Sequence, residues 1–300
     1  MLTLNEYINE NLTEGILSTT NSGKEMLKDK ILKKWLREHK AKRIKVEDGM
    51  LVLTGKSGVI TNEIHFNPGE TNLPDDIKFK NDKLISGLEI TGPDLKSIKW
   101  IPYLDGGCWL YIEDCDSLED FDNEAENGTI NITNCKKLKS FSGIKNIKNP
   151  GYFYLKDCPS LTSIKDFEGK ECSLSLKNCG VISLEGYPKT FDKKIVAEKC
   201  DKLVSLDIKW NVTPRSIELR KCKKLSKLGT CSWPNNDELN FIYLIDCPNV
   251  DEKFLEELYD SANHNPSFGA LSLIGTKINP NAPIVKRIKS ENPSWNFIIE

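Results

Sequence analysis

Seven cysteines that recur at nearly constant spacing constrain the fold of this chain more than any other feature of its sequence. Their separations run from 20 to 25 residues, and each cysteine stands in the same local frame. Two apolar residues separated by one position precede it, and further apolar residues follow it, as Leu118 and Phe121 follow Cys115. A period of this length is the signature of a repeat architecture. The frame recurs at Cys115, Cys135, Cys158, Cys179, Cys200, Cys222 and Cys247.

The apolar alternation before each cysteine predicts a short β-strand with two inward side chains. One such unit cannot bury its apolar side alone, whereas stacked neighbours form a parallel sheet with a continuous core behind it. We therefore predict an α+β solenoid with one parallel β-sheet, short coils of ~22 residues, extended or 3₁₀ return segments, and helical N- and C-terminal caps. The expected domains are a helix and hairpin cap at 1–60, the solenoid at 61–280 and a cap at 281–300.

Some copies depart from the frame. After Cys179 we expect Ile182 and Leu184 to point inward, although Leu184 comes one place early. Degenerate copies flank the seven regular ones, because the paired apolar residues occur there without the cysteine. Their strands are expected at 64–66, 88–90 and 271–273.

The cysteine column has a structural explanation. In such a repeat the residue after the strand turns the chain inward and satisfies buried backbone groups of the next coil, and a small thiol suits that position. Stacked disulfides are not expected, because we see no secretory signal. A zinc site is not expected either, because there is no C-x-x-C pair and ligands would come one per coil. We expect no metal and no cofactor, and Cys108, Cys172 and Cys231 lie off the column.

Two stretches carry a family resemblance. Cys179-Gly-Val-Ile182-Ser-Leu184-Glu-Gly186-Tyr-Pro188 and Cys200-Asp-Lys-Leu203-Val-Ser-Leu206 resemble a phrase, C-x-x-L-x-S-L-x-G-x-P, of leucine-rich-repeat proteins common in large tailed bacteriophages. The first stretch lacks one residue before Leu184, and the other copies lack the Gly-x-Pro ending. The resemblance covers roughly 75–280. It implies a leucine-rich-repeat fold and a phage origin, and says little about activity.

The first residues predict a short helical leader. Thr3 and Glu6 form a capping box for a helix over 1–17. The sequence Leu12-Thr-Glu14-Gly15 is similar to the sites cut by the head-maturation protease of T-even-like phages, which implies packaging in the capsid.

Further elements are predicted near both ends. Apolar residues at helical spacing, and an Asp-Gly pair between two apolar runs, are their signals. We expect a helix over 24–39, a hairpin of 44–46 with 51–53, helices over 250–262 and 282–290, and a strand over 297–299.

Charge and composition exclude several classes of function. The chain has 42 basic and 44 acidic residues, so no overall field attracts nucleic acid or a membrane surface. No run of 18 apolar residues exists, so we expect no membrane span. The segment 24–45 has ten basic and three acidic residues, which is read either as a nucleic-acid patch or as the solvated side of a cap helix. We expect a location in the host cytoplasm, with the virion as the alternative.

Nothing in the sequence indicates catalysis. Only three histidines occur, and no serine or cysteine nucleophile motif lies near them. A solenoid also offers a shallow surface where an enzyme needs a pocket, so we expect a protein without enzymatic activity.

The expected function is protein binding by the concave strand face. Strand residues between and just after the paired apolar ones point outward there, and they include the Tyr and Arg favoured at binding hot spots. The expected partner is a host protein, for which a defence component is one candidate. The alternatives are a structural or packaged virion component and a nucleic-acid binder acting through 24–45. The candidate partner-binding residues are Tyr111, Glu113, Tyr154, Lys156, Lys177, Glu218, Arg220 and Tyr243.

Overall fold

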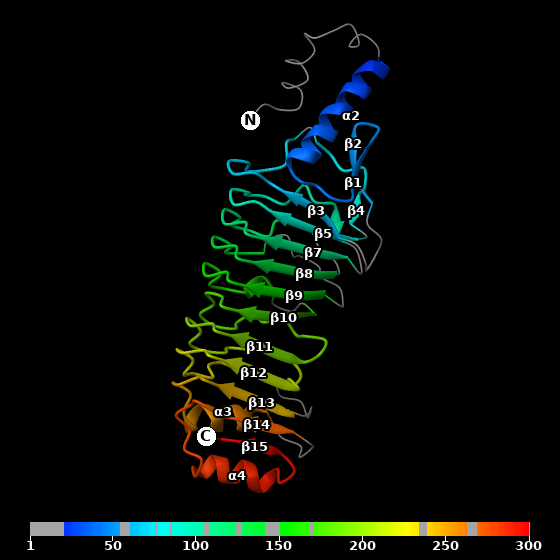
Figure 1. Cartoon of the computed structure of the whole chain (residues 1–300). Helices are drawn as coiled ribbons and strands as arrows, with labels where there is room; N and C mark the ends of the chain where they lie inside the picture. Colours follow the sequence, from blue (N-terminus) through cyan, green and yellow to red (C-terminus); the bar gives the residue numbers. More distant parts are fainter. Residues whose placement is uncertain are drawn as a thin grey trace. The chain divides into compact units, whose positions relative to one another are not determined.

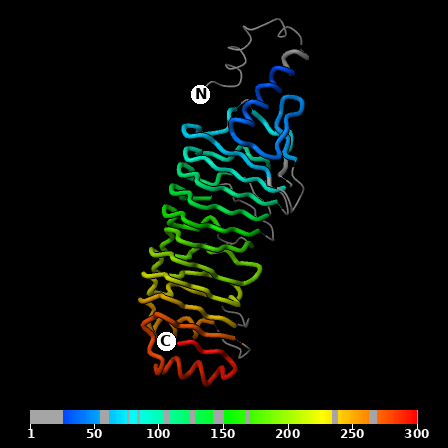
Figure 2. Tube along the Cα trace, viewed as in Figure 1, coloured from blue at the N-terminus to red at the C-terminus, as the bar shows by residue number. Residues whose placement is uncertain are grey.

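The computed structural model describes residues 21–54, 61–75, 77–84, 86–104, 108–123, 128–141, 151–167, 171–233, 239–262 and 269–299. Contacts between Cα atoms divide the chain into two compact units, Met1–Asn146 and Ile147–Glu300. Within each unit, short parallel strands are stacked one on the next and joined by returning loops (Figure 1, Figure 2). The predicted solenoid with short coils is confirmed. The predicted helix over 1–17, and the sequence within it that is similar to a protease cleavage site, lie outside the described residues.

The first unit combines a helix, a hairpin and four parallel strands. Helix α2 (Asn21–Glu38) contacts the hairpin strands β1 (Ile44–Glu47) and β2 (Met50–Leu53). Leu32 of α2 is completely buried and the adjacent Lys33 is exposed, as an amphipathic cap helix requires. The parallel sheet contains β3 (Thr61–His65), β5 (Gly87–Thr91), β7 (Trp109–Glu113) and β8 (Gly128–Thr133), and a small second sheet pairs β4 (Lys83–Leu84) with β6 (Tyr103–Leu104).

The predicted hairpin is present and follows from its turn. Asp48 and Gly49 have φ angles of 51° and 68°, both in the left-handed region. A two-residue hairpin turn of the type that matches the twist of the strands needs positive φ at both central residues, which Asp-Gly supplies.

The second unit contains seven parallel strands and two helices. Helix α3 begins at its cap Asp251, whose carboxylate accepts a hydrogen bond from the Phe254 amide, so the predicted helix over 250–262 is confirmed within two residues. The other predicted C-terminal helix and strand are also present. The elements are β9 (Gly151–Lys156), the 3₁₀ turn η2 (Lys165–Phe167), β10 (Cys172–Lys177), β11 (Lys194–Glu198), β12 (Ser216–Arg220), β13 (Phe241–Ile245), α3 (Glu252–Ser261), β14 (Ala270–Ser272), α4 (Pro283–Glu291) and β15 (Asn296–Ile298).

The core consists of matching inward positions on successive strands. Leu176, Ala197 and Leu219 are register partners on β10, β11 and β12, and all three are completely buried. Burying a leucine side chain contributes about 1.5–3 kcal/mol relative to leaving it exposed. Each coil contributes inward residues to the same columns. Within the unit, these columns form a continuous apolar interior.

Each column cysteine has its thiol within hydrogen-bond distance of the carbonyl two residues before it, and three of them, Cys179, Cys222 and Cys247, also reach a carbonyl of the preceding coil. The Cys179 thiol donates to the Leu155 carbonyl at 3.4 Å, and the Cys222 thiol to the Ala197 carbonyl at 3.7 Å. For these three cysteines our expectation of a contact with the next coil was therefore wrong. The parallel register places a carbonyl of the preceding strand beside the sulfur.

The residue before the column cysteine makes a backbone bond to the next coil in six of the seven coils, and the sequence frame did not reveal its role. This residue has a φ angle between 52° and 57° in all seven coils. The left-handed conformation turns its N–H toward the next strand, so that the amide of Asn178 donates to the Glu198 carbonyl at 2.8 Å. Asp and Asn adopt this conformation more readily than most residues. The seven residues are Asp114, Asn134, Asp157, Asn178, Lys199, Lys221 and Asp246.

The short coil after Cys179 departs from the prediction. Ile182, which was expected to point inward, is 51% exposed, and Val181 occupies the inward position instead. Gly180 explains the shift, because a Cβ there would lie 2.0 Å from the Pro159 carbonyl oxygen. Glycine lets the backbone approach the preceding coil closely, which moves Val181 inward and leaves Leu184 completely buried as expected.

Candidate functional site

Six of the eight predicted binding residues lie together on the outward face of the second unit. Parallel register places Tyr154, Glu218 and Tyr243 in one row across the sheet, and the other three in the adjacent row. The remaining two, Tyr111 and Glu113, lie on β7 of the first unit. The six are Tyr154, Lys156, Lys177, Glu218, Arg220 and Tyr243.

An aromatic and cationic group lies at the β12–β13 end of this face. The Arg220 guanidinium stands over the Tyr243 ring at 5.6 Å from its centroid. Phe241 stacks on the same ring, with centroids 6.2 Å apart and an interplanar angle of 7°. We call these three residues the β12–β13 cluster. Its side chains hold one another in position before any partner arrives, which lowers the entropy cost of binding.

A second aromatic group lies at the β9 end. Tyr154 is 45% exposed and Phe191 is 40% exposed. The Tyr152 ring meets the Phe191 ring edge-on at 5.2 Å. Tyr152, Tyr154 and Phe191 form what we call the β9 cluster.

Charges on this face are partly paired with one another. The Lys177 ammonium lies 3.0 Å from the Glu198 carboxylate, and both side chains are partly exposed. The Ser216 hydroxyl donates to the Glu218 carboxylate at 3.0 Å. These contacts make the middle of the face polar and leave the aromatic residues at its two ends.

Sequence reasoning missed two aromatic residues on strands and one in a loop. The alternation of a strand also turns the residue before its first inward position outward, which exposes Trp109 on β7 and places Tyr152 and Phe241 on the binding face. Extending the period by one step would have identified Tyr152 and Phe241. Phe191 lies in the loop before β11, where no periodicity identifies it.

Two tryptophans in the loops between strands of the second unit are buried. Trp210 and Trp233 are 3% and 1% exposed, and the Trp210 indole donates to the Tyr187 carbonyl at 3.2 Å. They pack the core of the second unit, so neither takes part in the outward face.

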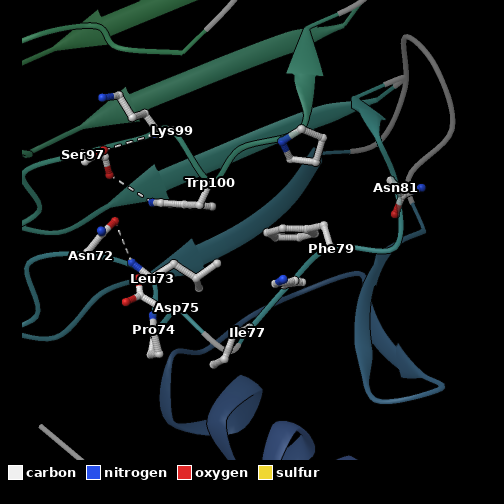
Figure 3. A pocket seen from close by; sticks show the side chains of 12 residues that line it. Asn72, Leu73, Pro74, Asp75, Ile77, Phe79, Asn81, Ser97, Lys99 and Trp100 are labelled. Atoms are coloured by element: carbon white, nitrogen blue, oxygen red, sulfur yellow. Dashed lines mark hydrogen bonds between the residues drawn. The ribbon is translucent and has the colours of Figure 1, made fainter. Parts of the chain in front are cut away.

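The first unit has a pocket of about 460 Å³ behind its sheet (Figure 3). Phe79 and Trp100 form its aromatic wall, with nearly parallel rings at 13° and centroids 6.0 Å apart. The Trp100 indole is fixed by donating to the Ser97 carbonyl at 3.0 Å. Leu73 and Ile77, both 4% exposed, complete the apolar lining.

A line of aromatic contacts connects this pocket with helix α2. Trp100 contacts Phe66 at 5.5 Å, Phe66 contacts Trp35 at 6.2 Å, and Trp35 stacks on His39 at 4.0 Å between ring centroids. The pocket wall is therefore anchored in the packing of the whole unit.

The second unit has a smaller pocket of about 280 Å³ whose charges are largely satisfied. Glu185 pairs with Lys165 at 3.0 Å, and Glu171 lies 3.8 Å from Lys189. The lining carboxylates Glu185 and Glu171 are thus offset by lysines, one outside the lining and one within it, and we assign no ligand to the pocket.

Several of the enclosed thiols are poor nucleophiles at neutral pH, whereas a hydrogen bond with the Cys222 thiol lowers the pKa of Cys247. Burial raises the pKa of Cys200 to about 11 and that of the off-column Cys231 to about 12. A hydrogen bond to the Cys158 thiol and burial raise the pKa of Cys179. The thiolate is the reactive form, so these side chains react little unless the protein opens.

The described residues form neither a metal site nor a membrane-spanning helix. Their His, Cys, Asp and Glu side chains form no group of three or more that would hold a metal ion. Among the helices described, none is long and apolar enough to cross a membrane. Comparison of the chain with protein-family models, with curated proteins and with solved structures gives no match.

Proposed function

We propose that this chain is a non-enzymatic leucine-rich-repeat protein that binds another protein through the outward face of its second unit. By the resemblance of its repeats, we further propose that it is encoded by a bacteriophage and acts on a host protein in the host cytoplasm. A defence component is the host protein class that we place first. These statements about origin and target rest on the resemblance, and the binding surface rests on geometry.

The β12–β13 cluster is the observation that carries the proposal. Tyr and Arg are among the residue types that contribute most at protein interfaces, and here an arginine and two aromatic rings are already packed together. A cation placed over a ring gains about 0.5–1 kcal/mol at an exposed site and more once water is excluded. A partner that covers Tyr243 would therefore strengthen a contact that is already formed.

The β9 cluster supports the same surface. Adjacent strands are ~4.8 Å apart, so the four steps from β9 to β13 span ~19 Å. A protein interface of ordinary size buries about 800 Å² on each side, a patch roughly 30 Å across. One partner is thus large enough to cover both clusters and the polar strip between them.

The experiment is an affinity capture followed by a direct measurement. The tagged full chain is incubated with host lysate and infected-cell lysate, and captured proteins are identified by mass spectrometry. The main captured protein is then purified and titrated against the wild type and the Arg220→Ala/Tyr243→Ala variant. We expect the Kd to rise about 30-fold or more, which corresponds to losing about 2 kcal/mol at a hot spot.

A matched control separates this face from any exposed aromatic residue. Trp109→Ala removes a 42% exposed, outward aromatic side chain from the first unit. Binding that is unchanged in this variant and weakened in Arg220→Ala/Tyr243→Ala places the interface on the second unit. Binding lost only in Trp109→Ala, or equal in all three proteins, contradicts the proposed surface.

Two alternative functions make different predictions. A packaged virion component would be found in purified particles and cleaved after Glu14. A nucleic-acid binder would use exposed cations of α2 such as Lys33 and Arg37, and its affinity would fall steeply with added salt. The exposed cations are the one feature that favours the second alternative, and they equally suit the solvated side of a cap helix.

A further inference from the structure

The pocket behind the first unit's sheet combines an accessible aromatic wall with several polar groups. Phe79 and Trp100 are both partly accessible, and their parallel rings border a space of about 460 Å³. Ligand pockets of proteins have volumes of this order and combine an apolar wall with a few polar groups. Figure 3 shows the two rings on one side of the space and Leu73 and Ile77 on the other.

The polar groups around this space are mostly hydrogen-bond donors. The side-chain oxygens of Asn72 and Asn81 accept from the amides of Leu73 and Leu53, at 3.1 Å and 3.0 Å. Within the part of the chain that the structure describes, their NH₂ groups have no acceptor. Both amides are held in place through their oxygens, so each has N–H groups left to offer a ligand.

Two lysines add positive charge at the same rim. Lys78 and Lys99 line the pocket and are exposed, and neither has a carboxylate at ion-pair distance among the described residues. Asp75 is the single acidic side chain in the described lining. The Ser97 hydroxyl, also in the lining, is already used as a donor to Asp122 at 2.7 Å. The pocket therefore offers an aromatic wall, two amide donors and a net positive charge.

From this combination we propose that the pocket binds a small aromatic anion, with a ring against Phe79 and Trp100 and its carboxylate, sulfonate or phosphate group near Lys78 and Lys99. An aromatic ring gains from stacking on the wall, and an anionic group gains charge-assisted hydrogen bonds from the rim. A neutral aromatic compound lacks the second contribution and a simple inorganic anion lacks the first. This pocket belongs to the first unit, whereas the protein-binding face proposed above belongs to the second.

The test uses 8-anilinonaphthalene-1-sulfonate, an aromatic sulfonate that becomes fluorescent when it binds. It is titrated into the full chain, beside its uncharged relative N-phenyl-1-naphthylamine and with inorganic phosphate as competitor. We expect saturable binding of one sulfonate per chain, about tenfold weaker binding of the neutral compound, and no displacement by millimolar phosphate. Equal affinity for the neutral compound, or displacement by phosphate alone, overturns the proposal.

Variants place the binding in this pocket. Lys78→Ala/Lys99→Ala removes the two rim charges from exposed positions, and Lys137→Ala/Lys139→Ala removes two exposed charges elsewhere in the same unit. We expect the Kd for the sulfonate to rise about tenfold in the first double variant and to stay within twofold in the second. An equal change in both variants, or no change in either, shows non-specific dye adsorption and overturns the proposal. Urea midpoints equal to wild type confirm that both variants are folded.

Phe79→Leu tests the aromatic wall separately from the charge. The variant keeps an apolar side chain and removes the ring, so we expect the affinity for the sulfonate to fall severalfold while Lys78 and Lys99 remain. Unchanged affinity would show that the ring of Phe79 does not contact the ligand and would contradict the proposed placement.

Discussion

The Nε2 atom of His39 lies 2.7 Å from a carboxylate oxygen of Glu70, and both side chains are almost completely buried. The other ring nitrogen of His39 lies 2.8 Å from the Trp35 carbonyl oxygen. The Glu70 oxygen also accepts from the Asn67 amide at 2.8 Å. Both ring nitrogens of His39 therefore face hydrogen-bond acceptors, and one Glu70 oxygen binds two partners. This pair fastens the end of α2 to the first coils of the sheet.

Removing one member of this pair should destabilise the first unit strongly. In Glu70→Leu the imidazole remains buried without its partner, and leaving a buried polar group without its hydrogen bond costs about 1–3 kcal/mol. Urea unfolding followed by circular dichroism measures the loss. Lys34→Ala is the control, because its pair with Glu38 is 3.8 Å long and about half exposed, and its loss should be barely measurable. A loss in Glu70→Leu as small as in the control would show that the buried pair contributes little.

The left-handed conformation of the residue before each column cysteine predicts that glycine at this position stabilises the protein. Lys221 has a φ angle of 57°, which costs a non-glycine residue about 1 kcal/mol. Lys221→Gly removes that cost and should raise the free energy of unfolding by about 0.5 kcal/mol after the entropy loss of glycine. Lys221→Val should lower it by about 2 kcal/mol, because a β-branched residue tolerates this conformation worst. Lys224→Gly, at an exposed position outside the left-handed set, should destabilise; the same sign for both glycine variants would contradict the argument.

Close approach between coils predicts the effect of a methyl group at Gly180. A Cβ at this position would lie 2.0 Å from the Pro159 carbonyl oxygen, so Gly180→Ala must separate two coils of the second unit. We expect a loss of about 3 kcal/mol or more in urea unfolding, within the range of severe packing defects. Gly69→Ala is the comparison, because no atom lies within 4 Å of its Cβ and only the strain of its φ angle of 87° remains. Equal losses in the two variants would mean that the coils separate easily.

The raised pKa of the buried Cys200 thiol predicts that the free energy of unfolding falls at alkaline pH. The pKa of Cys200 is raised by burial from 9.0 to about 11, so the unfolded chain loses this proton more readily than the folded one. Its contribution is complete below pH 9 and is lost as the pH rises toward 11. Between pH 8 and pH 10.5 the loss from this thiol is about 2 kcal/mol. Urea unfolding at both pH values should show a smaller loss in Cys200→Ala than in wild type, and an identical loss would exclude this thiol as a cause.

The sequence was sufficient to predict the coils because their signal is repeated. A single apolar pair such as Leu174 and Leu176 does not decide between secondary structures. Seven copies in phase predict parallel stacking, the inward columns of apolar residues and the cysteine column. The error at Ile182 arose where a single residue is missing. There the three-dimensional contact of Gly180 with Pro159, and not the count from Cys179, decides which side chain turns inward.

The candidate sites were predictable only in part, for a related reason. Successive side chains of a strand point to opposite faces, so the sequence alone predicts that Tyr154, Arg220 and Tyr243 point outward. The contact between Tyr152 and Phe191 joins a strand to a distant loop, and the rings of Phe79 and Trp100 meet through irregular segments. No period relates such residues, so their proximity appears only in the folded chain.

Because the coils of the second unit stack in register, substitutions at inward and at outward positions have different consequences. Inward positions and the thiol with its left-handed neighbour are shared by successive coils, so a change there disturbs the coils on either side. Outward positions contact mainly the same row of adjacent strands, so a substitution at one of them alters the surface and leaves the interior as it was. Duplication of one coil would add a further strand with three outward side chains in the existing rows. Such a protein can acquire new binding specificity by small steps, each of which preserves the fold.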